Sequence, residues 1–162
     1  MTTMRLLAKI VLISAAVAET GLCQCLIRGS DQPEAIPDEM AYSMMFNMLK
    51  IAPNEKGAQY GDRVDSYLAL IGLAETDRTA FRLVLTDFSI QADAYDQRLN
   101  RASESANGRD SPGLKSLFDH RKALGGQARD QLATVLSEGG AAALAKHVNS
   151  RVKPRTTMPC PM

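Results

Sequence analysis

The chain has 162 residues, 45% of them hydrophobic, and its 19 basic and 18 acidic side chains give a formal net charge of +1. This length and apolar content suit a single domain with a sizeable core. The balanced charge argues against nucleic acid or an acidic membrane as a partner. Aromatic residues are few, and Ala, Leu and Met supply most of the apolar side chains, which favours an all-α helical bundle over a sheet.

Residues 1–18 have the features of a cleavable signal peptide. Arg5 and Lys9 precede a short apolar run that ends in Ala16-Val17-Ala18, a small-residue cleavage pattern. The alternative is an N-terminal membrane anchor, but the apolar run of about 13 residues is shorter than the ~20 that a spanning helix needs. We therefore expect export to the periplasm or the medium, a mature chain that begins near Glu19, and no membrane span in the mature form.

Three cysteines lie near the ends of the exported chain, at Cys23, Cys25 and Cys160. In an oxidising compartment an odd number of cysteines leaves at least one thiol unpaired. A bridge between Cys23 and Cys25 would close a cramped ring, so one possibility is that Cys160 pairs with either of them. The other is three unpaired thiols in two frayed tails, because nothing in the sequence brings the termini together.

A loose leader and a Met-rich helix are expected next. Residues 19–36 contain Gly, Ser, Asp and Pro and predict a flexible leader. Pro37-Asp38-Glu39 predicts the start of a helix, with Pro in the first turn and acids beside it. This helix is apolar nearly all round as far as residue 51, so we expect it to be the most buried element. A second helix is expected over about 59–71.

The longest predicted helix covers residues 75–105. It contains neither Pro nor Gly, and its apolar side chains recur every three or four residues. At about 1.5 Å per residue it would be ~45 Å long, so it needs other helices along its whole length. The apolar stripe consists of Phe81, Val84, Phe88, Ala92, Tyr95, Leu99 and Ala102.

A turn at residues 107–113 predicts that this helix forms an antiparallel hairpin with a helix over 112–136, against which the Met-rich helix packs. Gly125-Gly126 marks a bend or a close helix contact in the second arm. A short last helix is expected over 138–150. We thus predict a bundle of four to five helices over residues 37–150.

The remaining residues, 151–162, are basic and contain three prolines. Proline cannot continue a helix, and chain ends with few apolar side chains are commonly poorly ordered. We therefore expect this segment to be an extended, mobile tail.

Two helix entries are alike: Leu73-Ala74-Glu75-Thr76-Asp77 and Leu136-Ser137-Glu138-Gly139-Gly140. Each has Leu before a capping position, which a hydrophobic staple explains by itself. The repeated entry is also similar to that of periplasmic stress chaperones of the Spy and CpxP type. Residues 136–144 and 147–155 resemble more closely the C-terminus of uncharacterised exported helical proteins from soil bacteria. The resemblances imply a helical fold and an envelope address, and the first implies a chaperone-like role.

Met40, Met44 and Met48 recur at intervals of four on one helix, with Met45 beside them. Thioethers are soft ligands that suit Cu(I), so these residues are a candidate metal site. Met is also a flexible filler of cores, and all of these positions fit the expected buried stripe, so we favour packing. Further soft ligands are available in the tail, at Met158, Cys160 and Met162.

The two histidines, His120 and His147, have no second His or Cys at ligand spacing, so we expect lone surface histidines. Acidic and basic residues alternate on the long helix and predict a solvated, ion-paired face: Asp87, Asp93, Asp96, Arg98 and Arg101.

No catalytic motif is present in the sequence, and we expect neither an enzyme nor a cofactor. The leading hypothesis is an exported, non-catalytic helical protein that binds other envelope or periplasmic proteins, in a chaperone-like manner. The alternative is a periplasmic protein that binds Cu(I) or another soft metal through the Met-rich helix.

Overall fold

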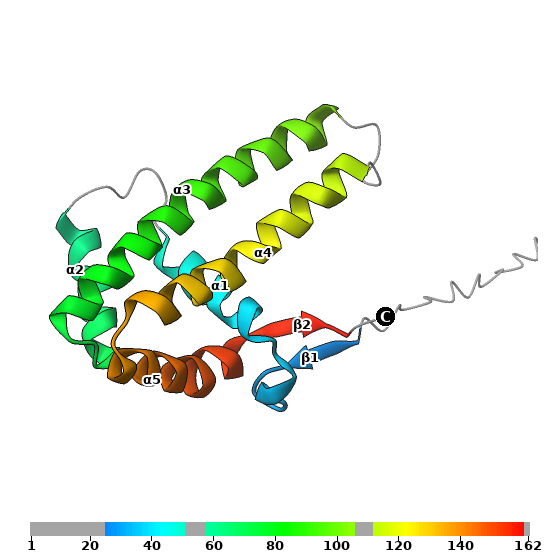
Figure 1. The fold of residues 1–162 in the computed structure, drawn as a ribbon. Coiled ribbons are helices and arrows are strands. Elements are labelled where there is room, and N and C mark those ends of the chain that lie inside the picture. Colours follow the sequence, from blue (N-terminus) through cyan, green and yellow to red (C-terminus); the bar gives the residue numbers. More distant parts are fainter. Residues whose placement is uncertain (1–24, 51–57, 106–111, 161–162) are drawn as a thin grey trace, which may run out of the picture.

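A computed structural model describes residues 25–50, 58–105 and 112–160, and Figure 1 shows their arrangement. The all-α fold is confirmed, with a short two-stranded ribbon added to it. The predicted signal peptide, Cys23 and Met162 lie outside the described residues. The helices are α1 (Asp38–Leu49), α2 (Ala58–Ile71), α3 (Glu75–Ser105), α4 (Pro112–Val135) and α5 (Glu138–His147).

The hairpin of α3 and α4 forms the frame, and α1 lies across it, as predicted (Figure 1). Phe46 of α1 stacks on Phe81 and Phe88 of α3, with ring centroids 5.5 and 4.9 Å apart. The Arg121 guanidinium of α4 lies 5.7 Å from the centroid of Phe88. Phe88 is therefore buried between α1 and α4, in the middle of the apolar stripe that was predicted for this helix.

Gly125 of α4 lies directly against the backbone of α1. A Cβ atom here would overlap Ser43 Oγ and the Glu39 carbonyl oxygen, and would lie 2.8 Å from Ser43 N. The neighbouring Gly126 has room, since a Cβ there would meet Glu39 Cβ at 3.6 Å. Of the two predicted roles for this glycine pair, the structure shows the close helix contact.

Gly72 follows Ile71, the last residue of α2, and its φ of 88° is a conformation that glycine adopts at little cost. The Leu73 amide donates to Leu68 O (3.2 Å) and the Gly72 amide to Ala69 O (2.9 Å), which is the pattern of a Schellman motif. Leu68 and Leu73 are both buried, and they supply the apolar contact typical of this motif. These bonds and this contact end α2 and lead the chain into α3.

Asp77 joins the start of α3 to the start of α5. Its carboxylate accepts hydrogen bonds from the Ser137 amide (2.8 Å) and the Ser137 hydroxyl (2.7 Å), and Ser137 Oγ accepts from Gly140 N (3.0 Å). Gly140 lies so close that a Cβ on it would be 2.7 Å from Asp77 Cγ. These bonds hold the pKa of Asp77 below its usual value, although burial opposes them. The two similar helix entries of the sequence thus meet in space.

The two ends of the described chain are ordered and lie together, contrary to the predicted flexible leader and mobile tail. β1 (Leu26–Arg28) pairs antiparallel with β2 (Thr157–Pro159), and a disulfide joins Cys25 to Cys160 with the Cα atoms 5.3 Å apart. After α5 the chain continues through helical turns at Val148–Val152 and Lys153–Arg155. The leader also contains a short turn at Pro33–Ala35.

The apolar side chains of these end segments explain the order. Ile36, Val148 and Val152 are buried in the same core as the helices. The Gly29 amide donates to Thr156 O at 2.8 Å, which continues the pairing of the two strands. The sequence predicted a mobile tail over 151–162 because of its prolines and charges, but Val152 makes this segment part of the core.

Candidate functional site

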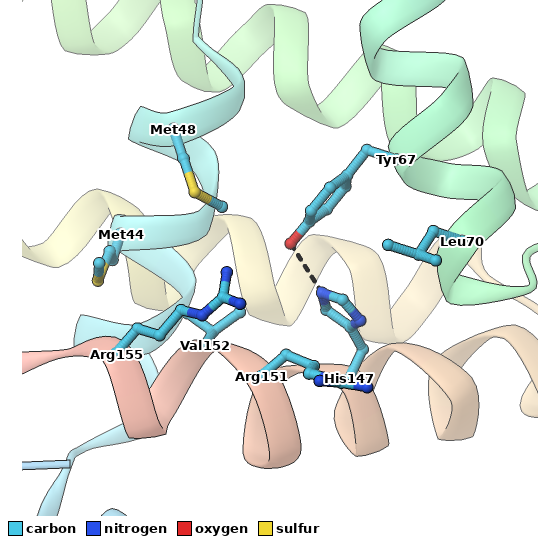
Figure 2. A pocket seen from close by; sticks show the side chains of 8 residues that line it. All are labelled: Met44, Met48, Tyr67, Leu70, His147, Arg151, Val152 and Arg155. Carbon is cyan, nitrogen blue, oxygen red and sulfur yellow. Dashed lines mark hydrogen bonds between the residues drawn. The ribbon is translucent and has the colours of Figure 1, made fainter. Parts of the chain in front are cut away.

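A pocket of about 350 Å³ lies between α1, α2 and the C-terminal helical segment (Figure 2). Its volume is near the lower end of the range of about 300–1,000 Å³ common for small-ligand sites. The apolar lining comes from three separate parts of the chain: Met44, Met48, Leu70 and Val152. Its polar groups belong to Tyr67, His147, Arg151 and Arg155.

The methionines of α1 divide between the core and the surface. Met45 is completely buried, whereas 47% of Met48 is exposed in the pocket. Met44 is half-buried, and its sulfur accepts a hydrogen bond from the Thr156 hydroxyl at 3.0 Å. Met40 lines a different hollow, beside Phe118 of α4. The prediction that Met40, Met44 and Met48 all join the buried stripe is therefore wrong for Met48, because the core-facing side of α1 is formed by Met45, Phe46 and Leu49.

His147 is not a lone surface histidine as predicted. Its Nε2 atom lies 2.9 Å from the Tyr67 hydroxyl, and the two rings meet edge to face at 5.2 Å. Burial lowers the pKa of His147, and the nearby Arg151 and Arg155 lower it further. Both effects favour the neutral imidazole. Burial also raises the pKa of Tyr67, although Arg155 opposes this, so the shifts of both groups favour their uncharged forms.

Two guanidinium groups give the pocket its charge. Arg151 and Arg155 are four residues apart on the C-terminal segment, on either side of Val152 in the lining. In Figure 2 the Arg155 guanidinium points toward Met48 and Tyr67. The eight lining residues include no acid, so the described wall of this pocket is apolar and positively charged.

The remaining candidate ligands lie elsewhere. His120 is exposed on α4, where its Nδ1 atom is 2.7 Å from Ser116 O, and this histidine does lie at the surface as predicted. Met158 is on β2, and the sulfur of Cys160 is in the disulfide. Within residues 25–50, 58–105 and 112–160, no group of three His, Cys, Asp or Glu side chains is placed to hold a metal ion.

The acidic face of α3 is ion-paired, but its partners come from other elements. Lys50 Nζ lies 2.6 Å from Asp93 Oδ1 and 3.0 Å from Asp96 Oδ2, and Arg121 Nε lies 2.8 Å from Asp96 Oδ1. Burial opposes ionisation of Asp96, but the hydrogen bonds from Arg121 and Lys50 outweigh it and lower its pKa. Asp87 bonds Gln91 of its own helix, and Arg98 lies over the ring of Tyr95. This cluster fastens α1 and α4 to α3.

Sequence reasoning missed the pocket because its parts are far apart in the chain. Tyr67 and Leu70 are three residues apart on α2, and this spacing was a usable signal for a shared face. Arg151 and Arg155 were assigned to a tail. They reach α1 and α2 only because the C-terminal segment is folded against the core.

Among the helices that the structure describes, none combines the length and apolarity needed to cross a membrane. Comparison with protein-family models, with curated proteins and with solved structures finds no match to this chain.

Proposed function

We propose that this chain is an exported, non-catalytic binding protein that holds apolar parts of other proteins in the pocket between α1, α2 and the C-terminal segment. The observation that carries the proposal is the exposure of large apolar side chains in that pocket. Leu70 is 76% exposed and Met48 47% exposed. Covering such side chains releases water from apolar surface, which favours association.

The chemistry of the lining suits a chaperone-like role. A methionine side chain has three rotatable bonds and a polarisable sulfur, so it adapts to apolar groups of different shapes. Met48 and Leu70 belong to α1 and α2, whose opposite faces are fixed in the core by Phe46 and Leu68. The pocket therefore combines adaptable side chains with rigid helices.

The test is the binding of a fluorescently labelled, permanently unfolded model protein, measured by anisotropy. The Met48→Ser/Leu70→Ser double variant removes two apolar groups that contribute little to the core, so it should stay folded. We expect binding at least about 30-fold weaker, since the two buried side chains together contribute on the order of 2–4 kcal/mol. The control is Ile90→Ser, a change of an equally exposed residue of α3 outside the pocket. An equal loss in the control, or no loss in the double variant, would overturn the proposal.

A soft-metal site is the second candidate, because Met48 and His147 line the same pocket. The two guanidinium groups beside them repel a cation, and Met40 lies apart, so we rank this function lower. A Cu(I) competition titration with a colorimetric chelator and ascorbate tests it. We expect no competition from the parent or from the variant with Met40, Met44 and Met48 all changed to Leu. Tight binding by the parent that the variant loses would establish the metal function.

The exported address is part of the proposal and is supported by the Cys25–Cys160 disulfide, since such bonds persist in oxidising compartments. Intact-mass measurement of the secreted protein tests it. We expect a chain that begins near Glu19 and gains two hydrogens per disulfide on reduction. A mass that includes residues 1–18 would contradict export with cleavage.

A further inference from the structure

We propose that the pocket selects an apolar group that ends in a carboxylate, a choice of ligand that rests on the proposed binding function. The ligand's apolar part would contact Met48, Leu70 and Val152, and its carboxylate would bind Arg151 and Arg155. Such an end occurs both in a free fatty acid and in the C-terminus of a peptide whose last residue is apolar.

The first argument is that the positive charge of the pocket is not neutralised. Neither Arg151 nor Arg155 forms an ion pair with a carboxylate of the described chain. The lysine between them behaves differently, since Lys153 Nζ lies 2.6 Å from Asp38 Oδ1 on the side facing α1. In this segment the lysine is therefore paired with an acid of α1, whereas the two arginines remain at the pocket.

The second argument is the chemistry of the two arginines. A guanidinium presents a planar set of N–H donors that matches the two oxygens of a carboxylate, and such charge-assisted bonds are stronger than neutral ones. Once the apolar part of the ligand covers Met48 and Leu70 and displaces water, the attraction is stronger than at an open surface. An anionic end therefore stabilises the complex here, whereas a cationic end is repelled.

The third argument is that the uncharged pair of Tyr67 and His147 does not compete with a ligand carboxylate for the two arginines. The Tyr67 hydroxyl and His147 Nε2 bond each other at 2.9 Å, so their polarity is satisfied within the wall. Neither group supplies a negative charge to the arginines. The carboxylate of the ligand is then the missing partner of the two guanidinium groups.

The test measures binding of decanoate to the full chain by calorimetry, beside decanamide, which has the same chain length and no charge. We expect decanoate to bind about 10–100-fold more tightly, the effect of charge-assisted hydrogen bonds worth about 1.5–3 kcal/mol. Shortening the acid by one methylene should weaken binding about fourfold while the tail still enters the pocket. Equal affinities for acid and amide would overturn the inference.

Variants locate the site. Arg151→Gln/Arg155→Gln should reduce decanoate affinity to that of decanamide and leave decanamide binding unchanged. The matched control is Lys146→Gln, an exposed cation of α5 outside the pocket. If the control loses as much affinity as the double variant, general attraction to a positive surface explains the binding and the inference is wrong.

A final comparison separates the two sources and the two proposals. A peptide that ends in Leu is tested with a free and with an amidated C-terminus. Preference for the free peptide assigns the carboxylate to protein ends. Binding of decanoate but of no peptide or unfolded protein supports the carboxylate site and contradicts the protein-binding function. Binding of unfolded protein, with no preference for decanoate over decanamide, supports the protein-binding function and contradicts the carboxylate site.

Discussion

Asp77 is the acid on which the junction of α3 and α5 depends, and its replacement by Asn tests that junction. Asp77 as a whole is 4% exposed, and its carboxylate accepts two hydrogen bonds from Ser137. An Asn side chain retains one accepting oxygen, but it places an NH₂ group where the second oxygen accepted the Ser137 hydroxyl. One charge-assisted hydrogen bond is lost, so we expect Asp77→Asn to lower the free energy of unfolding by about 1.5–3 kcal/mol.

The pH dependence supplies a second, independent signature. Because the pKa of Asp77 in the folded chain lies below its ordinary value of 3.8, the stabilisation is complete above that value and is lost as the pH falls through the folded pKa. Asn does not titrate. The stability difference between parent and variant should therefore be constant from neutral pH down to about pH 5 and should shrink below pH 4.

The assay is urea unfolding followed by circular dichroism, repeated across this pH range. A change of this size corresponds to a melting temperature about 3–12 °C lower for a domain of this length. The control is Asp87→Asn on the exposed face of α3, which should change stability by less than about 0.5 kcal/mol. A variant as stable as the control, or a difference independent of pH, would refute the assigned role of Asp77.

Three further experiments test the core, the helix contact and the closure of the chain ends. Phe88→Ala should cost about 3–5 kcal/mol in denaturant unfolding, whereas Arg98→Ala, at the exposed edge of α3, should cost about 0.5 kcal/mol or less. Equal denaturant midpoints for these two variants would show that Phe88 does not lie on the buried face of α3. Gly125→Ala should destabilise by about 1–3 kcal/mol because α1 must move, while Gly126→Ala should stabilise by up to about 1 kcal/mol through helix propensity; the opposite order would contradict the close contact. Cys160→Ser should lower stability by about 2–4 kcal/mol, measured against the parent without reductant, and an unchanged value would contradict the disulfide.

The helices were predictable because their signals are local. Phe81 and Phe88 lie on one stripe of a helix without Pro or Gly, and the boundaries of residues 75–105 follow from that pattern. The close contact at Gly125 was also foreseeable, since a glycine inside a helix usually has a packing reason. Which face of α1 enters the core was less clear, because that helix is apolar on several sides.

The candidate site was not predictable because it depends on contacts between distant segments. Tyr67 and His147 are 80 residues apart, and neither has a neighbour in sequence that indicates the other. Arg151 and Arg155 belong to a segment whose prolines and charges resemble a loose end. Burial of Val148 and Val152, with the pairing of β1 and β2, holds that segment against α1. A local sequence pattern does not reveal that the two ends of the chain pair with each other and pack against α1.

The most direct test of the binding site is a titration of the protein, labelled with ¹³C at its methionine methyl groups, with decanoate. Met48 lines the pocket and Met45 is buried in the core of the same helix, so one molecule contains both the probe and its control. We expect a saturable shift of the Met48 methyl resonance, with the same dissociation constant as calorimetry gives, while the Met45 resonance stays in place. Saturable binding that leaves the Met48 resonance unchanged would contradict the assignment of this pocket as the binding site.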